Sequence, residues 1–531
     1  MPDTVYQHIN DNVYNILQKK SYTNDDLYEL KTLFKEFFLY LVKDEQQYFP
    51  STFSIIIYCF DKYNIPDLNR NKIRYTWKKL SRVKKKDNKK VYRKQLYELI
   101  INFLNFVELI SNEKIQQNII ELIPKASIES STKEAESIYE SNIEFLNCII
   151  TSRIKKSTKN NIDKKLLYIF CESENYGEIE IFLNNFWAYV WKTVWKGCNV
   201  NFFNIKKLKN KENVYVPTPD SQIVIEPNYL LDVTELADCF QSKSVNIYMY
   251  FLKKFLPNKT SLPAIAGNIV NSCFDSLISN PKENFDEIFN NALKSKPLPF
   301  FVLASKDIES IKKIREIVFN QFLNLKNLVA DIKGDRIIVE PTFLSPDFGL
   351  QGRLDVLIEY DNEPTRKDII ELKSGKAPSI NFSSINQSGA IQASALWHNH
   401  LAQTTMYNLL LDSTFTNRVG TSQILYSIDF DFPLRNAPNL IEKKQEVIKY
   451  RNWIISIEKA LSNNYFQIFD SVANGKENIP KYLENAFNQF AFIYNNLDNL
   501  EKLYFHSFAS FIFREIRAGK IGTNSLKSKS N

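Results

Sequence analysis

The sequence predicts a mixed α/β fold, in which a mixed-sheet core is flanked by helices and preceded by a mainly helical N-terminal region. Three observations predict it. Apolar residues recur at helical spacing before residue 165, strand and helix signals alternate after it, and a helical pattern returns from about residue 440. With 44% hydrophobic residues among 531, the chain can bury several cores, so we expect more than one domain.

Four regions are expected along the chain. The runs DDLYELKTLFKEFFLYLV and QLYELIINFLNFVELI have the apolar spacing of amphipathic helices, whereas SQIVIEPNYLLDV and SQILYSIDFDF are typical of strands. We predict a helical region of unknown role at 1–165, a small α/β segment at 166–230, the core proper at 231–440, and a C-terminal helical region and tail at 441–531.

The best-defined local feature is a hairpin with a carboxylate in each strand. GRLDVLIEY and KDIIELKSG flank the turn-forming segment DNEPTR. Asp355 and Glu371 are equally far from Glu363 near the middle of the turn, so symmetrical pairing places them opposite each other, with Cβ atoms about 5 Å apart. Because side chains alternate along a strand, Lys373 shares a face with Glu371.

This arrangement suits metal-dependent cleavage of a phosphodiester bond. Two carboxylates at that separation repel each other unless a cation lies between them, and Mg²⁺ or Mn²⁺ prefers such oxygen ligands. Lys373 can orient or deprotonate a metal-bound water and offset the charge of a phosphate. The alternative is an ordinary amphipathic hairpin with a polar face, although both strands place their carboxylates among apolar residues.

The residues around the hairpin carry a family resemblance. FGLQGRLDVLIEY followed by DIIELKSGK resembles motifs II and III of the PD-(D/E)XK nuclease superfamily, in the RecB/AddB-type branch that includes the nuclease domain of replication nuclease-helicases. HLAQTTMYNLLL supplies Gln403 and Tyr407 for the helical Gln-x-x-x-Tyr motif of that branch. The resemblance implies that Gln403 and Tyr407 contact the active centre and the DNA backbone. It covers roughly residues 225–430.

Further positions fit the same resemblance. Glu340 matches an acidic position that precedes the glycine-containing element, and the spacing of Gly349 and Gly352 also fits. The resemblance implies that Asp355, Glu371 and the Leu372 carbonyl hold the metal ion, with Glu340 nearby.

One motif departs from the family pattern. AGNIVNSCFDSLI resembles the first motif, a helix reading Gly-x-x-x-His, but Asn271 occupies the histidine position. The family histidine binds the metal or lies beside it. Asn can still offer a neutral oxygen, but it cannot take up a proton near neutral pH. His398 and His400 precede the Gln-x-x-x-Tyr helix and are candidate substitutes, although a solvated helix start is the simpler interpretation.

The cysteines argue against a metal cluster. Relatives often hold a [4Fe–4S] cluster with one cysteine upstream of the nuclease core and three downstream. Cys239 lies at the upstream position, but no cysteine follows Gln403, so we expect no iron–sulfur cluster. No Cys-x-x-Cys spacing occurs, so a structural zinc ion is not expected either. We interpret all six cysteines as buried thiols of a reducing compartment.

A basic segment extends from Arg70 to Lys94 and contains a single acid, Asp87. Basic residues with aromatic neighbours suit a single nucleic-acid strand, through phosphate contacts and base stacking. The alternative is a solvated, highly charged helix–loop–helix. The aromatic residues of the segment are Tyr75, Trp77 and Tyr92, and its candidate DNA-binding lysines are Lys84, Lys85 and Lys86.

Several function classes receive no support. The formal charge of +8 is modest for this length, so any nucleic-acid footprint must be local. The sequence contains no Gly-x-x-x-x-Gly-Lys-[Ser/Thr] motif, so we expect no ATP binding. No apolar run approaches the roughly 20 residues that span a membrane, and MPDTVYQHINDN is unlike a signal peptide. We therefore expect a cytoplasmic protein without a membrane partner.

Together these observations predict a Mg²⁺-dependent deoxyribonuclease, an exonuclease rather than an endonuclease, acting on single-stranded or end-opened DNA. We expect it to work with a helicase in DNA repair or replication, with the helicase on a separate chain or in a missing C-terminal half. Two alternatives stay open: a catalytically weak DNA-binding subunit of a helicase–nuclease complex, and a phage-defence nuclease.

Overall fold

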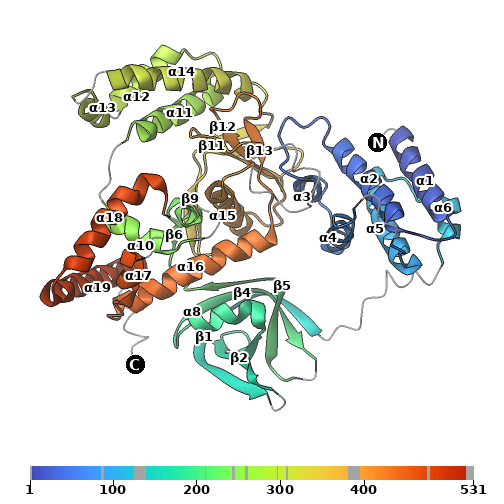
Figure 1. Ribbon diagram of the computed structural model, residues 1–531, viewed down its shortest axis with the longest axis horizontal. Helices are drawn as coiled ribbons and strands as arrows, with labels where there is room; N and C mark the ends of the chain where they lie inside the picture. The colour runs from blue at the N-terminus through green and yellow to red at the C-terminus, as the bar shows by residue number, and fades with distance from the viewer. Residues whose placement is uncertain are drawn as a thin grey trace. The chain divides into compact units, whose positions relative to one another are not determined.

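A computed structural model of the chain is shown in Figure 1. It describes residues 3–84, 89–124, 139–158, 161–209, 211–241, 245–256, 261–295, 297–305, 309–380, 395–474 and 479–521. The chain divides into two compact units. The first comprises Met1–Ser137, Lys376–Leu396 and Val419–Pro438, and the second comprises Ile138–Gly375, Trp397–Arg418 and Asn439–Asn531.

Helices dominate the first unit, as predicted for the N-terminal region. They are α1 (Asp3–Leu17), α2 (Asn24–Leu41), α3 (Thr52–Lys62), α4 (Asp67–Leu80), α5 (Arg93–Ser111) and α6 (Gln117–Leu122). Helix α2 begins at a capping box, in which Thr23 and Asp26 satisfy each other's backbone N–H groups. Phe34 on α2 packs against Phe38 and Phe103, so aromatic side chains fill the core between the helices.

The first unit also contains a short hairpin of β12 (Ser422–Tyr426) and β13 (Leu434–Asn436). Tyr48 pairs with Arg435 of β13, and its N–H group donates to the Leu434 carbonyl at 2.8 Å. The sequence predicted a strand in SQILYSIDFDF, and β12 confirms it.

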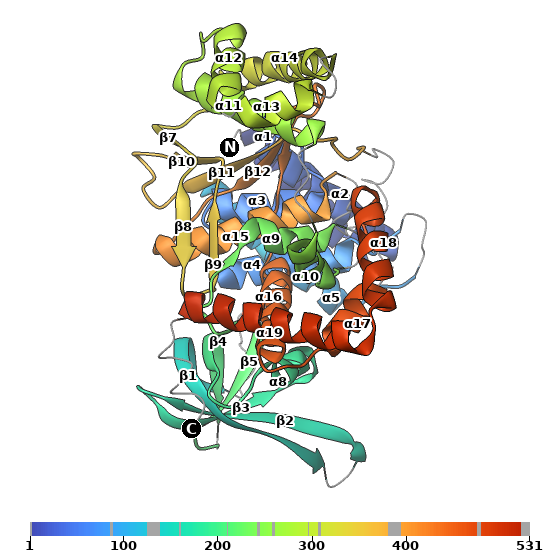
Figure 2. The ribbon, with the colours of Figure 1, turned by 90° about the vertical axis from the view of Figure 1, so that its left-hand side faces the viewer.

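The second unit opens with a closed five-stranded barrel, coloured green-cyan in Figure 2. Its strands are β1 (Tyr139–Thr158), β2 (Asn161–Ser173), β3 (Gly177–Leu183), β4 (Asn199–Leu208) and β5 (Val214–Ile225), and α8 (Ala188–Thr193) lies between β3 and β4. The order around the barrel is β1-β2-β3-β5-β4. Strands β3 and β5 run parallel, whereas the ladders β1–β2, β1–β4, β2–β3 and β4–β5 are antiparallel.

The barrel corrects two predicted boundaries. Strand β1 lies inside the range 1–165 that we expected to be helical. The range 166–230 is most of a barrel rather than a small α/β segment. Leu146, Cys148 and Ile150 of β1 are buried at strand spacing, a signal that the prediction missed because it extended the helical pattern of the preceding segments to residue 165.

The rest of the second unit surrounds two small sheets. One contains β7 (Arg336–Val339), β10 (Val356–Glu359) and β11 (Lys367–Lys373), and the other contains β6 (Leu231–Asp232), β9 (Leu350–Arg353) and β8 (Thr342–Ser345). The flanking helices are α9 (Val233–Ala237), α10 (Tyr248–Phe255), α11 (Leu262–Ser279), α12 (Phe285–Ser295), α13 (Pro297–Ala304), α14 (Glu309–Val329) and α15 (His398–Thr414).

Four helices end the chain, in agreement with the helical pattern expected after residue 440. They are α16 (Ile441–Ser462), α17 (Gln467–Asn474), α18 (Lys481–Asn496) and α19 (Asn499–Ile521). Within the described residues, none of the helices has the length and apolar content needed to cross a membrane.

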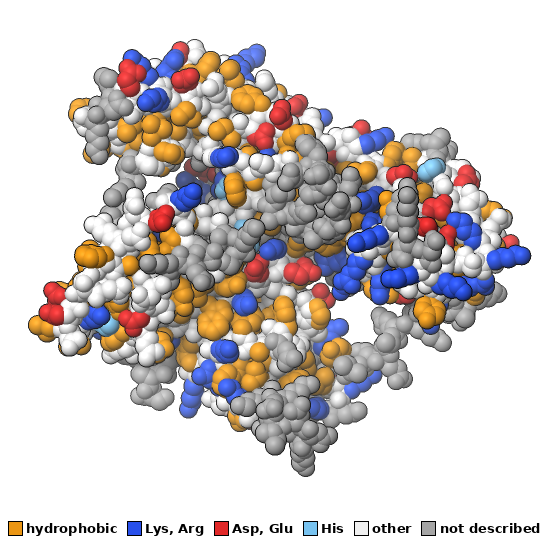
Figure 3. Space-filling model, in the orientation of Figure 1, with side chains coloured by type: hydrophobic (Ala, Val, Ile, Leu, Met, Phe, Trp, Pro, Cys, Tyr) orange, Lys and Arg blue, Asp and Glu red, His pale blue; other side chains and the backbone are white. Residues whose placement is uncertain are grey.

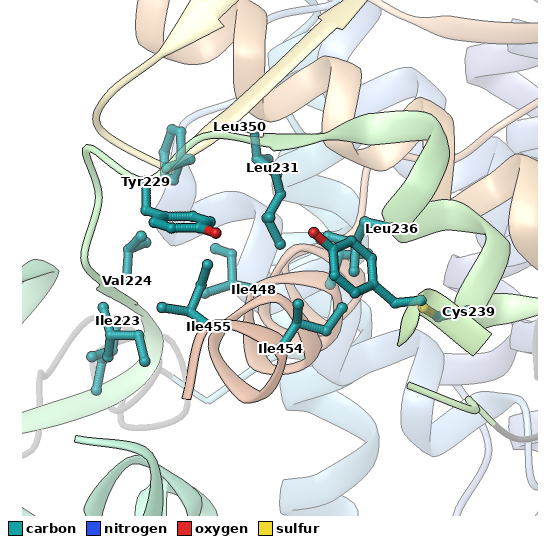
Figure 4. Close-up of a cluster of buried hydrophobic side chains, with 14 of the residues drawn as sticks. Ile223, Val224, Tyr229, Leu231, Leu236, Cys239, Leu350, Ile448, Ile454 and Ile455 are labelled. Carbon is teal, nitrogen blue, oxygen red and sulfur yellow. The ribbon is translucent and has the colours of Figure 1, made fainter. Parts of the chain in front are cut away.

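Helix α16 joins the barrel to the rest of its unit. Figure 4 shows Ile448, Ile454 and Ile455 of α16 among buried side chains from β5, β6, α9 and β9. The Arg451 guanidinium donates to the carbonyls of Gly349, Ile225, Glu226 and Tyr229. One side chain therefore satisfies backbone acceptors at the end of the barrel and at the start of the sheet that follows.

Candidate functional site

The predicted hairpin is present and has the predicted register. Strands β10 and β11 are antiparallel, with Val356 opposite Ile370. One further step along this register places Asp355 opposite Glu371. The Leu372 N–H group donates to Asp355 Oδ2 at 2.7 Å, which fixes the Asp355 carboxyl against β11.

A chain of hydrogen bonds connects the hairpin to α15. Lys373 Nζ donates to Glu371 Oε1 at 2.8 Å and to Gln403 Oε1 at 2.7 Å. Gln403 Nε2 donates to the Tyr407 hydroxyl at 2.8 Å, and this hydroxyl donates to the Arg353 carbonyl at 2.9 Å. The structure thus brings Glu371 and Lys373 of β11 together with Gln403 and Tyr407 of α15. Lys373 and Gln403 are 30 residues apart in the sequence.

The two facing carboxyl groups, Asp355 and Glu371, are buried and disfavour each other's negative charge. Burial, together with the neighbouring Glu371 charge, raises the pKa of Asp355 well above its ordinary value, although Lys373 opposes this shift. Glu371 is only 2% exposed, and its Oε2 atom has no hydrogen-bond partner among the residues that the structure describes. An unpaired buried carboxylate oxygen is costly, so this pair suits a bound cation.

The available ligands match a hard divalent cation. No group of three or more His, Cys, Asp or Glu side chains suited to a metal occurs in the described part of the chain. A cation at this pair would have only Asp355 and Glu371 as side-chain ligands, with the Leu372 carbonyl as the further ligand that the resemblance implies and water completing its shell. Mg²⁺ commonly binds through one or two carboxylates and keeps several waters.

Glu340 lies on the other side of Asp355. Val356 is opposite Val339 in the β7–β10 ladder, so the same register places Glu340 opposite Asp355. The Glu340 N–H group donates to the Asp355 carbonyl at 2.8 Å. Its carboxylate accepts a hydrogen bond from Arg353 at 3.0 Å, which directs it toward Arg353.

The sequence prediction missed Asp275 on α11. Burial and the nearby Glu340 charge raise the pKa of Asp275 to about 6, while Arg353 lowers it. Asp275 comes four residues after Asn271, and this i+4 spacing was the signal that could have identified it. A Cβ atom added to Gly267, four residues before Asn271, would lie 2.9 Å from Ser374 Oγ. The face of α11 that carries Asn271 is therefore directed toward the end of β11.

Two histidines near the start of α15 have different environments. Burial and the positive charge of Lys373 lower the pKa of His400 to about 2, so its ring stays neutral near pH 7 and lies close to the hairpin. His398 lies 3.9 Å from Glu446 and edge-on to the Phe240 ring. Its side chain is 19% exposed. This helix start is therefore packed against the protein, and the solvated start favoured by the sequence is wrong.

Close packing explains why glycine occupies the two positions, 349 and 352, that fit the resemblance. Gly349 has φ +63°, and a Cβ atom there would lie 2.0 Å from Arg451 Nη2. A Cβ atom on Gly352 would lie 3.0 Å from Val233 and 3.3 Å from the Tyr407 ring. Both glycines allow close packing beneath the hairpin.

Gln403 and Tyr407 are both largely buried, and their expected contact with DNA stays a prediction. Tyr407 is 2% exposed and Gln403 is 7% exposed. The geometry gives Tyr407 the task of holding Gln403, which in turn holds Lys373.

The basic segment is only partly as expected. Trp77 is buried and stacks on Phe34 with ring centroids 5.6 Å apart, so it is unavailable to bases. Arg70 pairs with Asp61 and caps the end of α3. Lys84 is exposed, whereas Lys85, Lys86 and Asp87 lie outside the described residues. Lys and Arg side chains are nevertheless frequent on the face of these helices shown in Figure 3.

All six cysteines are buried, as predicted, and none forms a disulfide within the described residues. Cys239, which was compared with an upstream cluster ligand, is 1% exposed, and burial raises its pKa to about 12. Its thiol is therefore protonated and lies in the core.

No family model matches the sequence, and no curated protein matches it.

Proposed function

We propose that this protein is a metal-dependent nuclease that hydrolyses phosphodiester bonds of DNA. The observation that carries the proposal is the unpaired Glu371 Oε2 atom beside Asp355, with Lys373 held on the same face. Lys373 occupies only the other oxygen of this buried carboxylate, Oε1, so Oε2 is left for a cation.

Each residue has a distinct task in this proposal. Asp355, Glu371 and the Leu372 carbonyl would bind Mg²⁺ or Mn²⁺, which when bound would polarise the phosphate and acidify a water molecule. Lys373 is held by Glu371 and Gln403, so its ammonium group stays beside the position of the phosphate and offsets its negative charge. Tyr407 fixes Gln403 from behind and is a positioning residue.

The preferred substrate would be single-stranded or end-opened DNA, with exonucleolytic cleavage and a separate helicase to open duplexes during repair or replication. A second candidate is a catalytically weak DNA-binding subunit. Asn271 favours it, because an amide at the position of the family histidine cannot exchange a proton. A phage-defence nuclease would use the same chemistry.

The test compares two carboxylate substitutions on one hairpin. We expect Asp355→Asn to abolish Mg²⁺-dependent degradation of single-stranded DNA, because it removes one charge of the cation site. Glu363→Gln is the matched control, because Glu363 lies at the turn and its side chain is 55% exposed. Degradation by wild type in excess EDTA, or equal activity of Asp355→Asn, would refute the metal-dependent mechanism. A folded but inactive wild type would instead support the weak-subunit candidate.

A further inference from the structure

The positive charge of the chain is concentrated in one part of the first unit. The segment from Arg70 to Lys94 has 13 of the 68 Lys and Arg residues and one of the 60 acids. The rest of the sequence therefore has 55 basic residues against 59 acids and is slightly acidic. A local excess of positive charge in an otherwise acidic chain is typical of a surface that binds a polyanion.

Six exposed cations of this segment have no carboxylate partner. Elsewhere in the same unit, Lys62 pairs with Glu45 and Lys19 pairs with Asp26. The six cations, by contrast, form no ion pair within the described part of the chain, so their charges are available to a bound anion. These six side chains, which we call the basic surface, are Lys78, Lys79, Arg82, Lys84, Lys90 and Lys94.

The basic surface begins on α4. Lys78, Lys79 and Arg82 follow Tyr75 at spacings of three and four residues, so they share one side of the helix and its C-terminal end. Lys79 Nζ lies over the Tyr75 ring, 5.4 Å from its centroid. Trp77 is buried in the core instead. Between Tyr75 and Arg82, every exposed position is therefore aromatic or basic.

The stretch after α4 is fixed to α2. Lys31 of α2 donates through its Nζ atom to the carbonyls of Ser81 and Val83, each at 2.9 Å. These two residues flank Arg82, and Lys84 follows Val83 directly. The backbone that carries both exposed cations is therefore held in place before any ligand binds, which lowers the cost of binding.

The stretch before α5 is fixed to the start of α2. The Asn24 N–H group donates to the Lys89 carbonyl at 2.9 Å, and Thr23 forms an antiparallel bridge with Lys90. Tyr92 follows two residues later and is 83% exposed. A ring that is so exposed beside fixed cations offers a surface on which a base can stack.

These features favour a nucleic-acid strand over other polyanions. A helix that binds an anionic membrane needs aliphatic side chains beside its cations, whereas the exposed positions from Tyr75 to Arg82 have none. An acidic protein segment offers no planar base to Tyr92. A single strand presents phosphates and unpaired bases together, so it matches both the cations and the exposed ring.

From these observations we propose that the basic surface binds single-stranded nucleic acid, with phosphates on its cations and a base stacked on Tyr92. The strand would bind the first unit, at a site separate from the candidate nuclease site of the second unit. The inference goes beyond the proposed function, because this binding requires neither cleavage nor a metal ion.

The first test measures the phosphate contacts without cleavage. The full chain carrying Asp355→Asn is titrated in EDTA into a fluorescent dT oligonucleotide of about 15 nucleotides, and anisotropy is read at several salt concentrations. Addition of Lys84→Gln and Lys90→Gln should reduce the steepness of log affinity against log salt by about 0.7 for each lost contact. An unchanged steepness would overturn the proposal.

The matched control removes two exposed lysines from the second unit. Lys209 and Lys211 lie between β4 and β5, and the Glu180 N–H group donates to the Asn213 carbonyl just beyond them. Lys209→Gln with Lys211→Gln removes the same charge and should leave the steepness unchanged. An equal reduction in both double variants would reflect net charge alone and would also overturn the proposal.

The second test removes the exposed ring. We expect Tyr92→Ala to weaken binding of the dT oligonucleotide about tenfold through the loss of one stacked base. Tyr504→Ala is the matched control, because Tyr504 is 71% exposed in the second unit. Equal affinities of these two variants would contradict the stacking role of Tyr92 and the proposal with it.

Competition in the same assay identifies the ligand. Unlabelled dT, an rU oligonucleotide, a blunt duplex, and vesicles of phosphatidylcholine and phosphatidylserine compete for the Asp355→Asn chain at equal phosphate concentration. Strongest competition by dT or rU supports the proposal and identifies the strand. Strongest competition by the duplex or by the vesicles overturns it.

A cross-linking measurement covers the case in which a variant at the basic surface fails to fold. The Asp355→Asn chain is irradiated with a dT oligonucleotide that contains photoreactive 5-iododeoxyuridine, and the attached peptides are identified by mass spectrometry. We expect attachment at Tyr75 or Tyr92. Cross-links confined to the second unit would refute the site. Because none of these measurements depends on cleavage, failure of the nuclease proposal leaves their outcome interpretable.

Discussion

The side chain of Lys373 is held in place by a series of hydrogen-bonded residues. Its ammonium group lies between Glu371 and Gln403, and Gln403 is held in turn by Tyr407. Because these residues are buried, loss of one partner leaves the others without compensation from water. The position of the charged group is therefore set by neutral side chains on α15.

We predict that Tyr407→Phe lowers both stability and activity. The substitution removes a hydroxyl that accepts from Gln403 and donates to the Arg353 carbonyl. Two buried polar groups lose a partner, so the free energy of unfolding should fall by about 1–3 kcal/mol. Urea denaturation measures this loss, and kcat on single-stranded DNA reports the release of Gln403. Tyr504→Phe is the control, because Tyr504 is 71% exposed; equal stability of the two variants would contradict the prediction.

At the scale of elements, helix α16 and the segment before β9 depend on each other sterically. The Arg451 side chain occupies the space where Gly349 has no Cβ atom, and it binds the Gly349 carbonyl at 3.1 Å. Gly349 also has the left-handed backbone conformation that other residues rarely adopt. The glycine and the arginine thus form one packing unit.

Gly349→Ala should therefore be strongly destabilising, by about 3 kcal/mol or more, since it combines a severe overlap with backbone strain. Gly375→Ala provides the comparison, because a Cβ atom on Gly375 meets nothing within 4 Å. Denaturant midpoints of both variants measure the difference. If Gly349→Ala were as stable as Gly375→Ala, the tight contact with Arg451 would be wrong.

A second element-scale prediction concerns acid stability. Burial alone would raise the pKa of Glu446, but the nearby His398 and the hydrogen bond from Lys443 outweigh it and lower the pKa from 4.5 to about 2. The stabilisation is therefore complete above about pH 4.5 and is lost as the pH falls toward 2. Glu446→Gln should lower stability by about 1–2 kcal/mol at neutral pH. Urea midpoints of the wild type and of Glu446→Gln, measured from pH 7 downward, give this difference in stability. A difference that stays constant down to pH 3 would contradict the linkage to the pKa of Glu446.

The elements also show what the sequence could and could not predict. The β10–β11 hairpin was predictable, because its alternation and its turn are local signals. The barrel was not, because its closure depends on β1 pairing with β4 and β3 pairing with β5, which are distant in sequence. At the site, the facing carboxylates followed from hairpin symmetry. The burial of Tyr407 could not be predicted in this way. It depends on the packing of α15 against Gly352 of β9, which is distant in the sequence.

At the scale of the whole molecule, the second unit combines the candidate nuclease site with a closed barrel, and Arg451 of α16 is hydrogen-bonded both to the barrel end at Ile225 and to the segment before β9 at Gly349.

We predict that the purified chain degrades single-stranded DNA efficiently and blunt duplex poorly, and that ATP changes neither rate. The reason is that the proposed substrate is single-stranded or end-opened DNA, so a blunt duplex must be opened before it can be cut. Product formation from matched single-stranded and blunt duplex substrates, with and without ATP, measures this. Rapid ATP-independent digestion of blunt duplex would indicate a self-sufficient enzyme and would contradict the need for a partner.

The four carbonyls that accept hydrogen bonds from Arg451 determine whether the barrel can be isolated in the laboratory. A shortened chain ending before α16 would leave these acceptors unpaired and uncover the apolar side chains around Ile448, Ile454 and Ile455. Such a fragment should aggregate rather than yield an isolated barrel. Protein engineers who wish to transplant the barrel must therefore carry α16 with it.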